Sequence, residues 1–285
     1  MENKILREFI LKSLHEDLGD GDHSSLACIP ENTTGKAKLL IKEKGILAGI
    51  RVAGVLFNTI DKDLKFDVLS VDGDSVIPGD IAFYISGSQQ SILKSERLVL
   101  NIMQRMSGIA TNTHEFVSQL KGLKTKILDT RKTTPGFRFL EKEAVRIGGG
   151  MNHRMGLFDM IMLKDNHIDY AGGIENAIIL TNEYLKRNNL NLNVEIEARS
   201  LEDVSTIISV GGVNRIMLDN FGIKDTLSAV KLISGRYETE SSGGITLETI
   251  RSYAECGVDF ISVGALTHHI KSLDMSLKAI YKTRV

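Results

Sequence analysis

Basic side chains follow two consecutive apolar segments of the chain. Residues 126–128 lead through Asp-Thr into Arg131 and Lys132, and residues 160–163 lead directly into Lys164. Short apolar runs of this kind are typical of buried strands, so these cations stand at strand ends. The carboxyl ends of parallel strands meet at one edge of an α/β barrel, where such folds build their sites. The pattern predicts a cationic site for a small anion.

The positive charge is local. Residues 121–167 contain ten Lys and Arg against five Asp and Glu, whereas the whole chain has a formal net charge of −1. A nucleic-acid partner would call for a broad basic face, which this balance does not predict. For any single lysine the alternative is an ordinary exposed surface residue.

Acidic residues mark the next two expected strands. Strand side chains alternate, so Glu195 and Glu197 lie on one face of a strand at 192–197. Buried carboxylates are costly unless cations meet them, which the three cations above or a metal could do. An edge strand with a polar face is the alternative. The strand at 214–218 ends in Asp219, a suitable ligand for Mg²⁺ together with phosphate oxygens.

Glycines and small residues follow the last two expected strands. Residues 241–244 read Ser-Ser-Gly-Gly and residues 263–267 read Val-Gly-Ala-Leu-Thr. Backbone N–H groups in such loops, next to a helix start, suit a phosphate. Between residues 168 and 240 the charge is reversed, with eleven acids against seven bases. We therefore expect an acidic small molecule on one side of the site and a metal-bound phosphorylated molecule on the other.

The C-terminal part of the chain alternates between the two hydrophobic periods. Strands are expected at 125–129, 159–163, 192–197, 214–218, 236–241 and 259–263. Helices are expected at 139–148, 174–187, 201–210, 223–234 and 246–256. This alternation is typical of βαβ units and suggests a closed barrel.

The N-terminal part predicts a smaller α+β unit. Helical patterns cover residues 3–18 and 51–60, with short strands between and after them. A helix over 95–106 should close at Ser107-Gly108 and resume after a kink, linking two domains. Residues 270–282 have an amphipathic helical pattern and should pack back on the first domain.

The composition is that of an ordinary globular enzyme. The chain has 285 residues, of which 42% are hydrophobic and 25% charged. Cys28 and Cys256 form neither a disulfide framework nor a metal-ligand pair, so a cytoplasmic location is expected. No run of about 18 apolar residues predicts a membrane span, and the N-terminal pattern is not that of a signal peptide.

Taken together, the motifs resemble those of quinolinate phosphoribosyltransferase. The matching segments, in the order of that family, are residues 16–22, 95–98, 129–136, 153–154, 163–167, 195–197, 218–220, 242–246 and 264–267. They cover nearly the whole chain. Two features depart from the pattern: His23-Ser24 follows Asp22 where the family more often has a threonine, and Arg199 has no assigned role.

The resemblance implies an α/β protein of two domains. The first, residues 1–108 plus 270–285, would be an α/β sandwich completed by the last helix. The second, residues 109–269, would be an incomplete α/β barrel of the type II phosphoribosyltransferase kind, with six or seven strands. The implied reaction converts quinolinate and phosphoribosyl diphosphate to nicotinate mononucleotide, diphosphate and CO₂ in NAD biosynthesis, with Mg²⁺ and no organic cofactor.

The resemblance also implies residue roles. The two carboxylates of quinolinate would be held by Arg131, His153, Arg154 and Lys164. Arg97 would reach the same pocket from a partner subunit, so a homodimer or a higher homo-oligomer is expected, without nucleic-acid or membrane partners. Lys132 and Lys164 would touch the phosphoribosyl donor, and Glu197 and Asp219 would bind metal and ribose. The 5′-phosphate site would contain Ser242, Gly243, Gly244, Gly264 and Ala265, with His268 nearby. Catalysis would rest on Lys132, Lys164, Glu197 and Asp219.

Three alternatives remain open. A relative that uses nicotinate without decarboxylation would lack the carboxylate-binding cations, all of which this chain has. A Schiff-base lyase or aldolase on an α/β barrel would use Lys164 as its nucleophile. A non-catalytic phosphate-binding protein would have no need for Glu197 and Asp219.

Overall fold

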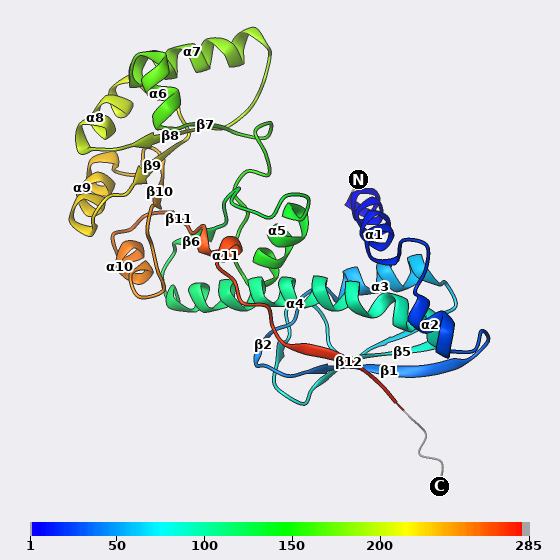
Figure 1. The fold of residues 1–285 in the computed structure, drawn as a ribbon. Helices are drawn as coiled ribbons and strands as arrows, with labels where there is room; N and C mark the ends of the chain where they lie inside the picture. Colours follow the sequence, from blue (N-terminus) through cyan, green and yellow to red (C-terminus); the bar gives the residue numbers. More distant parts are fainter. Residues whose placement is uncertain (1, 281–285) are drawn as a thin grey trace. The chain divides into compact units, whose positions relative to one another are not determined.

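The computed structural model describes residues 2–280, which form two compact units (Figure 1). The first unit contains the chain up to Asn112, Pro135–Gly148 and the chain from Ile270 onward. The second contains Thr113–Thr134 and Gly149–His269. Compared with the expected division at residues 108 and 270, the first boundary lies after Asn112, and the segment 135–148 belongs to the first unit and not to the barrel.

The second unit is built on one parallel sheet of six strands. These are β6 (Lys126–Leu128), β7 (Ile161–Leu163), β8 (Val194–Ala198), β9 (Arg215–Asp219), β10 (Glu238–Ser242) and β11 (Phe260–Ser262). Their order in the sheet is β6-β11-β10-β9-β8-β7, and among the described residues no ladder joins β6 to β7. The barrel is thus open between these two strands. The closed barrel suggested by the alternation alone is wrong, and the incomplete barrel is confirmed.

Helices connect these strands in the right order for βαβ units. They are α6 (Asp165–Ala171), α7 (Ile174–Arg187), α8 (Leu201–Val210), α9 (Ile223–Ile233), α10 (Ile250–Glu255) and α11 (Ala265–His268). In Figure 1 helices α7 to α10 follow one another along the outer side of the sheet. The strands are buried on both sides, so their carboxyl ends are the natural place for polar groups.

The first unit packs helices on an antiparallel sheet with the strand order β12-β1-β5-β3. The strands are β1 (Thr34–Ile41), β3 (Lys65–Val68), β5 (Ile81–Ser88) and β12 (Met275–Ala279), and β2 (Gly45–Ile46) pairs separately with β4 (Ser75–Val76). The helices are α1 (Glu2–Leu18), α2 (His23–Cys28), α3 (Ile50–Ile60), the first part of α4 (Gln89–Gln119), and α5 (Arg138–Ile147). Helix α5 belongs here because Glu141 is fully buried and forms an ion pair with Arg105 at 2.6 Å.

The last segment is a strand, which corrects the predicted helix over 270–282. Strand β12 runs antiparallel to β1, with Leu277 opposite Leu39. Met275 and Leu277 are buried, whereas Ser276 is less so and Lys278 is exposed. This alternation of period two overrides the helical spacing, because β1 offers an open edge for backbone hydrogen bonds. Residues 281 and 282 of the predicted helix lie outside the described residues.

Helix α4 runs through Ser107-Gly108 without the predicted break. The side chain of Ser107 is satisfied, since its Oγ accepts the backbone N–H of Ala48 at 2.9 Å. A Cβ on Gly108 would overlap the carbonyl oxygen of Lys271. The glycine therefore permits a close backbone approach inside a helix, at a cost of about 1 kcal/mol in helix propensity.

No helix among the residues 2–280 is both long and apolar enough to cross a membrane.

Candidate active site

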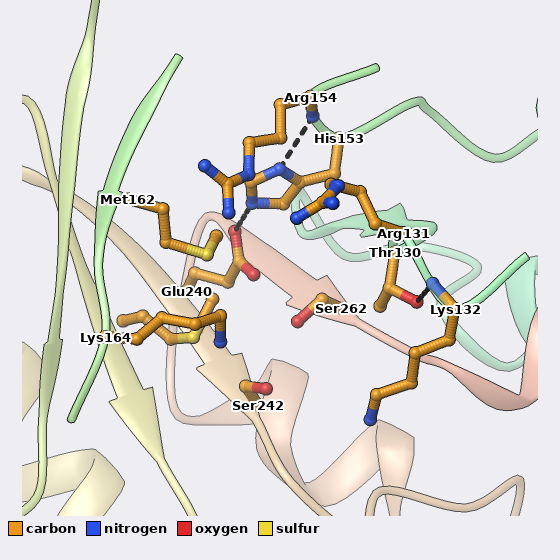
Figure 2. Close-up of a pocket in the computed structure, with 11 residues that line it drawn as sticks. Thr130, Arg131, Lys132, His153, Arg154, Met162, Lys164, Glu240, Ser242 and Ser262 are labelled. Carbon is orange, nitrogen blue, oxygen red and sulfur yellow. Dashed lines mark hydrogen bonds and ion pairs between the residues drawn. The ribbon is translucent and has the colours of Figure 1, made fainter. Parts of the chain in front are cut away.

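A cavity of about 300 Å³ lies at the carboxyl ends of the barrel strands (Figure 2). It is lined by Thr130, Arg131, Lys132, His153, Arg154, Met162, Lys164, Met217, Glu240, Ser242 and Ser262. All of these residues belong to the second unit. The volume is at the lower end of the range for small-molecule sites. Six of the predicted site residues are thus brought together: Arg131, Lys132, His153, Arg154, Lys164 and Ser242.

Four cations in the cavity form what we call the cationic set, namely Arg131, Lys132, Arg154 and Lys164. Lys132 is exposed and the other three are half-buried. The Nε atom of Arg131 is buried and makes no hydrogen bond with any residue that the structure describes. A buried donor of this kind normally has a partner, so it points to an anionic ligand.

The loop that follows β6 is held in place by its own polar groups. Thr130 Oγ1 accepts the backbone N–H of Lys132 at 3.1 Å, and the carbonyl of Lys132 accepts the hydroxyl of Thr267 at 2.8 Å. Asp129 is fully buried and accepts the backbone N–H of His153 at 2.8 Å and the amide of Asn152 at 2.6 Å. The end of β6 therefore positions both Lys132 and the segment 152–154.

Lys164 is paired with Glu197. Its Nζ donates to Glu197 Oε1, and Glu197 Oε2 accepts the backbone N–H of Asp165 at 3.1 Å. The prediction that a cation meets this inward glutamate is confirmed. The contact with the carboxylate occupies Nζ, whereas a Schiff-base nucleophile has to be free to attack a carbonyl. This geometry speaks against the lyase alternative.

Asp219 lies at the end of β9 beside the Glu197 carboxylate, outside the set of cavity-lining residues. Burial and then the charge of Glu197 raise the pKa of Asp219 above its ordinary value, while Lys164 acts in the opposite direction. Asp219 Oδ2 accepts the side-chain N–H of Asn220 at 2.7 Å. Two carboxylates that repel each other at a strand end fit a divalent cation, which would relieve the repulsion.

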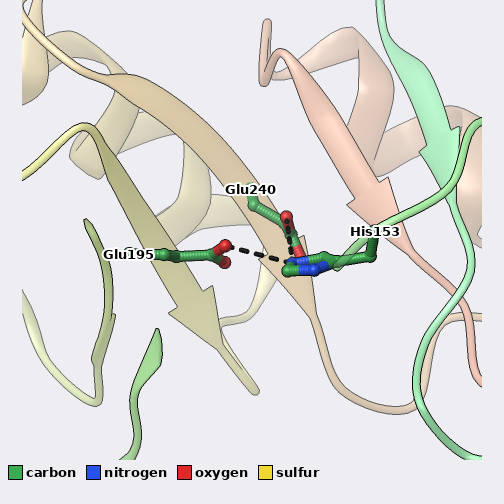
Figure 3. A group of neighbouring side chains, drawn as sticks. All are labelled: His153, Glu195 and Glu240. Atoms are coloured by element: carbon green, nitrogen blue, oxygen red, sulfur yellow. Dashed lines mark ion pairs between the residues drawn. The ribbon is translucent and has the colours of Figure 1, made fainter. Parts of the chain in front are cut away.

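A second group of charged residues, the buried cluster, consists of His153, Glu195, Arg215 and Glu240. His153 Nε2 lies 3.0 Å from Glu195 Oε2 and 3.5 Å from Glu240 Oε2 (Figure 3). Arg215 Nη1 lies 2.9 Å from Glu240 Oε2 and 3.7 Å from Glu195 Oε2. The side chains of both glutamates are fully buried. Sequence reasoning proposed other cations for Glu195 and missed both Arg215 and Glu240.

His153, Glu195 and Glu240 each offer one ligand atom, all within 4.8 Å of one another, as a metal site requires. The guanidinium of Arg215 already supplies a cation to both carboxylates, so we assign no metal there. Burial alone would lower the pKa of His153, but hydrogen bonds with Glu195 and Glu240 outweigh it and raise that pKa to about 9. Burial and the neighbouring Glu240 raise the pKa of Glu195.

The glycine loops after β10 and β11 are close-packed. Gly243 has φ +97, and a Cβ there would overlap the side-chain oxygen of Asn220. A Cβ on Gly264 would lie 2.8 Å from His268 Nε2 and 3.2 Å from Lys132 Cδ. Gly243 therefore requires glycine, whereas a side chain at Gly264 would need His268 and Lys132 to move, and the segment after β11 adjoins a member of the cationic set.

The remaining predicted residues stand apart from the cavity lining. Gly243 and Gly244 follow β10, Gly264 follows β11, and Ala265 and His268 belong to α11; none of them lines the cavity. Burial, followed by His269 and Lys132, lowers the pKa of His268.

Arg97 is exposed on α4, in the first unit, and is likewise absent from the lining. Arg199, for which the sequence predicted no role, forms an exposed ion pair with Asp169 at 2.8 Å.

Two family models match the chain. Residues 22–107 match the N-terminal domain of quinolinate phosphoribosyl transferase, and residues 109–278 match its C-terminal domain. The chain belongs to the quinolinate phosphoribosyltransferase family. The resemblance inferred from the sequence is thereby confirmed.

Members of the quinolinate phosphoribosyltransferase family from plants and bacteria are similar over nearly the full chain. The chloroplastic nicotinate-nucleotide pyrophosphorylase (carboxylating) of Arabidopsis thaliana is 47% identical, over 96% of this chain and 82% of the relative. The probable nicotinate-nucleotide pyrophosphorylase (carboxylating) of Bacillus subtilis is 40% identical, over 96% of this chain and 92% of the relative.

Solved structures of the family share the fold. The crystal structure of NadC from Streptococcus pyogenes has a TM-score of 0.91 and 40% identity, and the match covers 96% of each chain. The nicotinate-nucleotide pyrophosphorylase from Francisella tularensis also has a TM-score of 0.91 and 40% identity, covering 98% of this chain and 97% of that one. The incomplete barrel and the N-terminal domain are therefore the family's own architecture.

Proposed function

We propose that this chain catalyses the transfer of a phosphoribosyl group from phosphoribosyl diphosphate to quinolinate, with decarboxylation. The products are nicotinate mononucleotide, diphosphate and CO₂, and the reaction belongs to NAD biosynthesis. The observation that carries the proposal is the cationic set around a cavity of about 300 Å³, together with the buried Nε of Arg131. Family membership supports the same reaction.

Quinolinate has two adjacent carboxylates on a planar ring, and the cavity offers cations to both. Arg131, Arg154 and Lys164 would bind them, with His153 as the fourth residue of this subsite. Guanidinium groups suit carboxylates because they donate parallel hydrogen bonds. The thioethers of Met162 and Met217 line the same cavity and would contact the ring.

Phosphoribosyl diphosphate, the donor, would lie on the side of Lys164 opposite to quinolinate. Lys132 and Lys164 would touch its phosphates, and Glu197 and Asp219 would bind ribose and hold Mg²⁺. When bound, this ion would neutralise charge on the diphosphate. The 5′-phosphate would lie against Ser242, Gly243 and Gly244 at the end of β10, and against Gly264, Ala265 and His268 after β11.

The residues would act by positioning and by electrostatics. As the bond between the ribosyl carbon and diphosphate breaks, positive charge develops on that carbon, and Glu197 and Asp219 stabilise it. The ring nitrogen then forms the new bond. Loss of CO₂ leaves its electron pair on the adjacent ring carbon, which takes a proton from water. Lys132 and Lys164 stabilise that negative charge.

Arg97 supports a shared active site. It is an exposed arginine on α4 that is not among the residues lining the cavity, and it would complete the quinolinate subsite of a partner subunit in a homodimer. A cytoplasmic location agrees with two cysteines that are both free. Some plant relatives are chloroplastic or mitochondrial, so location is not fixed by the family.

The test is a magnesium-dependent assay with carboxyl-labelled quinolinate and phosphoribosyl diphosphate. Nicotinate mononucleotide and labelled CO₂ are expected in equal amounts. Turnover of nicotinate without turnover of quinolinate would contradict the proposal and favour the non-decarboxylating alternative. Inactivity with both, combined with borohydride trapping of a keto substrate on Lys164, would favour the lyase.

A further inference from the structure

Two segments that would bind opposite ends of the donor leave the sheet side by side. Strands β6 and β11 are parallel neighbours, and the N–H of Val263 donates to the carbonyl of Leu128 at 3.0 Å. Beyond this point the chain continues as residues 129–132 after β6 and as residues 264–268 after β11. The first segment carries Lys132, which would bind the diphosphate, and the second would bind the 5′-phosphate.

Thr267 connects these two segments through its hydroxyl. The residue is fully buried, and its Oγ1 donates to the carbonyl of Lys132 at 2.8 Å and lies 3.3 Å from the carbonyl of Gly264. A hydroxyl has a single hydrogen to donate, so the shorter of these two contacts is the stronger hydrogen bond. Thr267 is therefore bonded across the sheet edge, from α11 to the loop after β6.

The ordinary role of a buried threonine in a helix is different. Such a hydroxyl usually bonds a carbonyl three or four residues earlier in its own helix. Thr226 does so at the start of α9, where its Oγ1 donates to the carbonyl of Gly222 at 3.0 Å. Thr267 has an equivalent local acceptor in Gly264, yet its shorter contact is with Lys132. The hydroxyl thus joins two segments of the chain.

Lys132 is placed by two further contacts. Its backbone N–H donates to Thr130 Oγ1 at 3.1 Å (Figure 2). A Cβ added at Gly264 would lie 3.2 Å from Lys132 Cδ, so the aliphatic part of the lysine passes close to this glycine. An exposed lysine that is ordered before its ligand arrives loses less conformational entropy on binding.

We infer that Thr267 is a positioning residue for the donor: its hydroxyl holds Lys132 at a set distance from the segment 264–268, and thereby matches the spacing between the diphosphate and the 5′-phosphate of phosphoribosyl diphosphate. The inference rests on the proposed function for the identity of this ligand. One ribose joins the two phosphate ends, so a fixed spacing favours the whole donor over either end alone. Thr267 does not line the cavity and acts through Lys132.

The connection can be measured without any substrate. Thr267→Val keeps the shape of the buried side chain but removes the hydrogen-bond donor. Hydrogen–deuterium exchange of the backbone N–H groups in residues 129–134, followed by mass spectrometry, should become about five-fold faster in this variant. Thr267→Ser keeps the hydroxyl and should exchange at the wild-type rate. Unchanged exchange in Thr267→Val would overturn the inference whether or not the protein uses quinolinate.

A binding measurement separates the donor from one of its ends. In Thr267→Val the dissociation constant of phosphoribosyl diphosphate with Mg²⁺, measured by calorimetry, should rise about five-fold, the effect of one neutral hydrogen bond. The dissociation constant of inorganic diphosphate with Mg²⁺ should stay within about two-fold, because this probe occupies one subsite and does not need the spacing. KM for quinolinate should also stay within about two-fold. Thr267→Ser should restore the wild-type affinity for the donor. An equal rise for both phosphate ligands would contradict a role in spacing.

The matched control is Thr226→Val, which removes an equally buried hydroxyl from a backbone carbonyl of the same unit. It should leave the exchange of residues 129–134 and the affinity for the donor unchanged. An equal loss of affinity in this control would contradict the inference. If Thr267→Val does not fold, Thr267→Ala removes the same hydroxyl and should give the same pattern, and wild-type behaviour of that variant would refute the connection. If the wild type does not bind phosphoribosyl diphosphate, the proposed function fails, whereas the exchange measurement still decides whether Thr267 holds Lys132.

Discussion

The cationic set and the buried cluster lie beside the same cavity but are built in opposite ways. Arg131 and Lys132 follow β6, Arg154 precedes β7 and Lys164 follows it, and these cations keep part of their surface open, with 45% of the Lys164 side chain exposed. The carboxylates of the buried cluster project from the middle of β8 and β10 and are 0% exposed. Charges that could meet a ligand are left accessible, whereas the buried carboxylates are paired with His153 and Arg215 inside the protein. Substitutions in the two groups should therefore have different consequences.

The largest effect is expected for Lys164→Met in the cationic set. Methionine keeps the length of the side chain but removes the charge, so kcat/KM should fall about 10³-fold, as for the loss of an electrostatic group in a transition state. The substitution leaves the buried carboxylate of Glu197 without its cation, so the free energy of unfolding should fall by about 1–3 kcal/mol while the protein remains folded. Steady-state kinetics and circular dichroism check both points. Lys126→Met, at the opposite end of a barrel strand, is the control and should be fully active. Retention of more than a tenth of the activity by Lys164→Met would contradict its catalytic role.

For the buried cluster, we instead expect an effect on how the free energy of unfolding depends on pH. The pKa of His153 is about 9 in the folded protein, against 6.5 for an unperturbed histidine. The folded state thus retains a proton that the unfolded chain releases. The resulting stability is fully present below about pH 6.5 and is lost as the pH rises through about 9. From 1.36 kcal/mol per pKa unit, the free energy of unfolding should change by about 3 kcal/mol.

Urea unfolding between pH 6 and 9.5 measures this term, with His153→Gln as the comparison. The wild type should lose stability across the interval, and the variant should lose less by the stated amount. Parallel profiles for the two proteins would show that the cluster holds no such proton. His15 is exposed on α1, so its replacement by glutamine is a second control.

Asp219→Asn tests the acidic strand ends next to the cationic set. The amide keeps the shape and the contact with Asn220 but offers a weaker ligand to a divalent cation. The Mg²⁺ concentration for half-maximal activity should rise about ten- to thirty-fold, the effect of losing one carboxylate ligand. Asp225→Asn, exposed in the first turn of α9, is the control. An unchanged Mg²⁺ requirement would show that Asp219 is not a ligand of the metal ion.

The strand ends could be predicted from the sequence, because each short apolar run is followed directly by its functional residue. Arg131, Lys132, Lys164 and Ser242 were placed in this way, and the structure brings them to one cavity. That a cation meets Glu197 also followed from the cost of burying an acid, although the sequence left open which cation, or a metal, would do so. These inferences use only the side-chain period of two and the common edge of a parallel sheet.

The buried cluster could not be predicted, because it depends on the register between strands. Arg215 lies opposite Glu238 on β10 and opposite Glu195 on β8, and the sequence does not fix these pairings. Glu240 is an acid inside an expected buried strand, which indicates a buried ion pair, but the sequence does not show which residue is its partner. The helix predicted over 270–282 was wrong for a related reason. Leu277 fits both a helical and a strand period, and pairing with the open edge of β1 makes this segment a strand.

The smallest effect is expected for Arg97→Ala, and it distinguishes a shared site from a self-contained one. Arg97 is exposed, so its removal should leave the unfolding transition unchanged while KM for quinolinate rises about ten-fold. Lys94→Ala, on the same helix, is the control. At quinolinate concentrations well below KM, mixing Arg97→Ala with Lys164→Met subunits should restore about a quarter of the wild-type activity, because half of the dimers are mixed and each has one complete site. If Arg97 serves its own subunit, no mixed dimer has a complete site and mixing restores nothing.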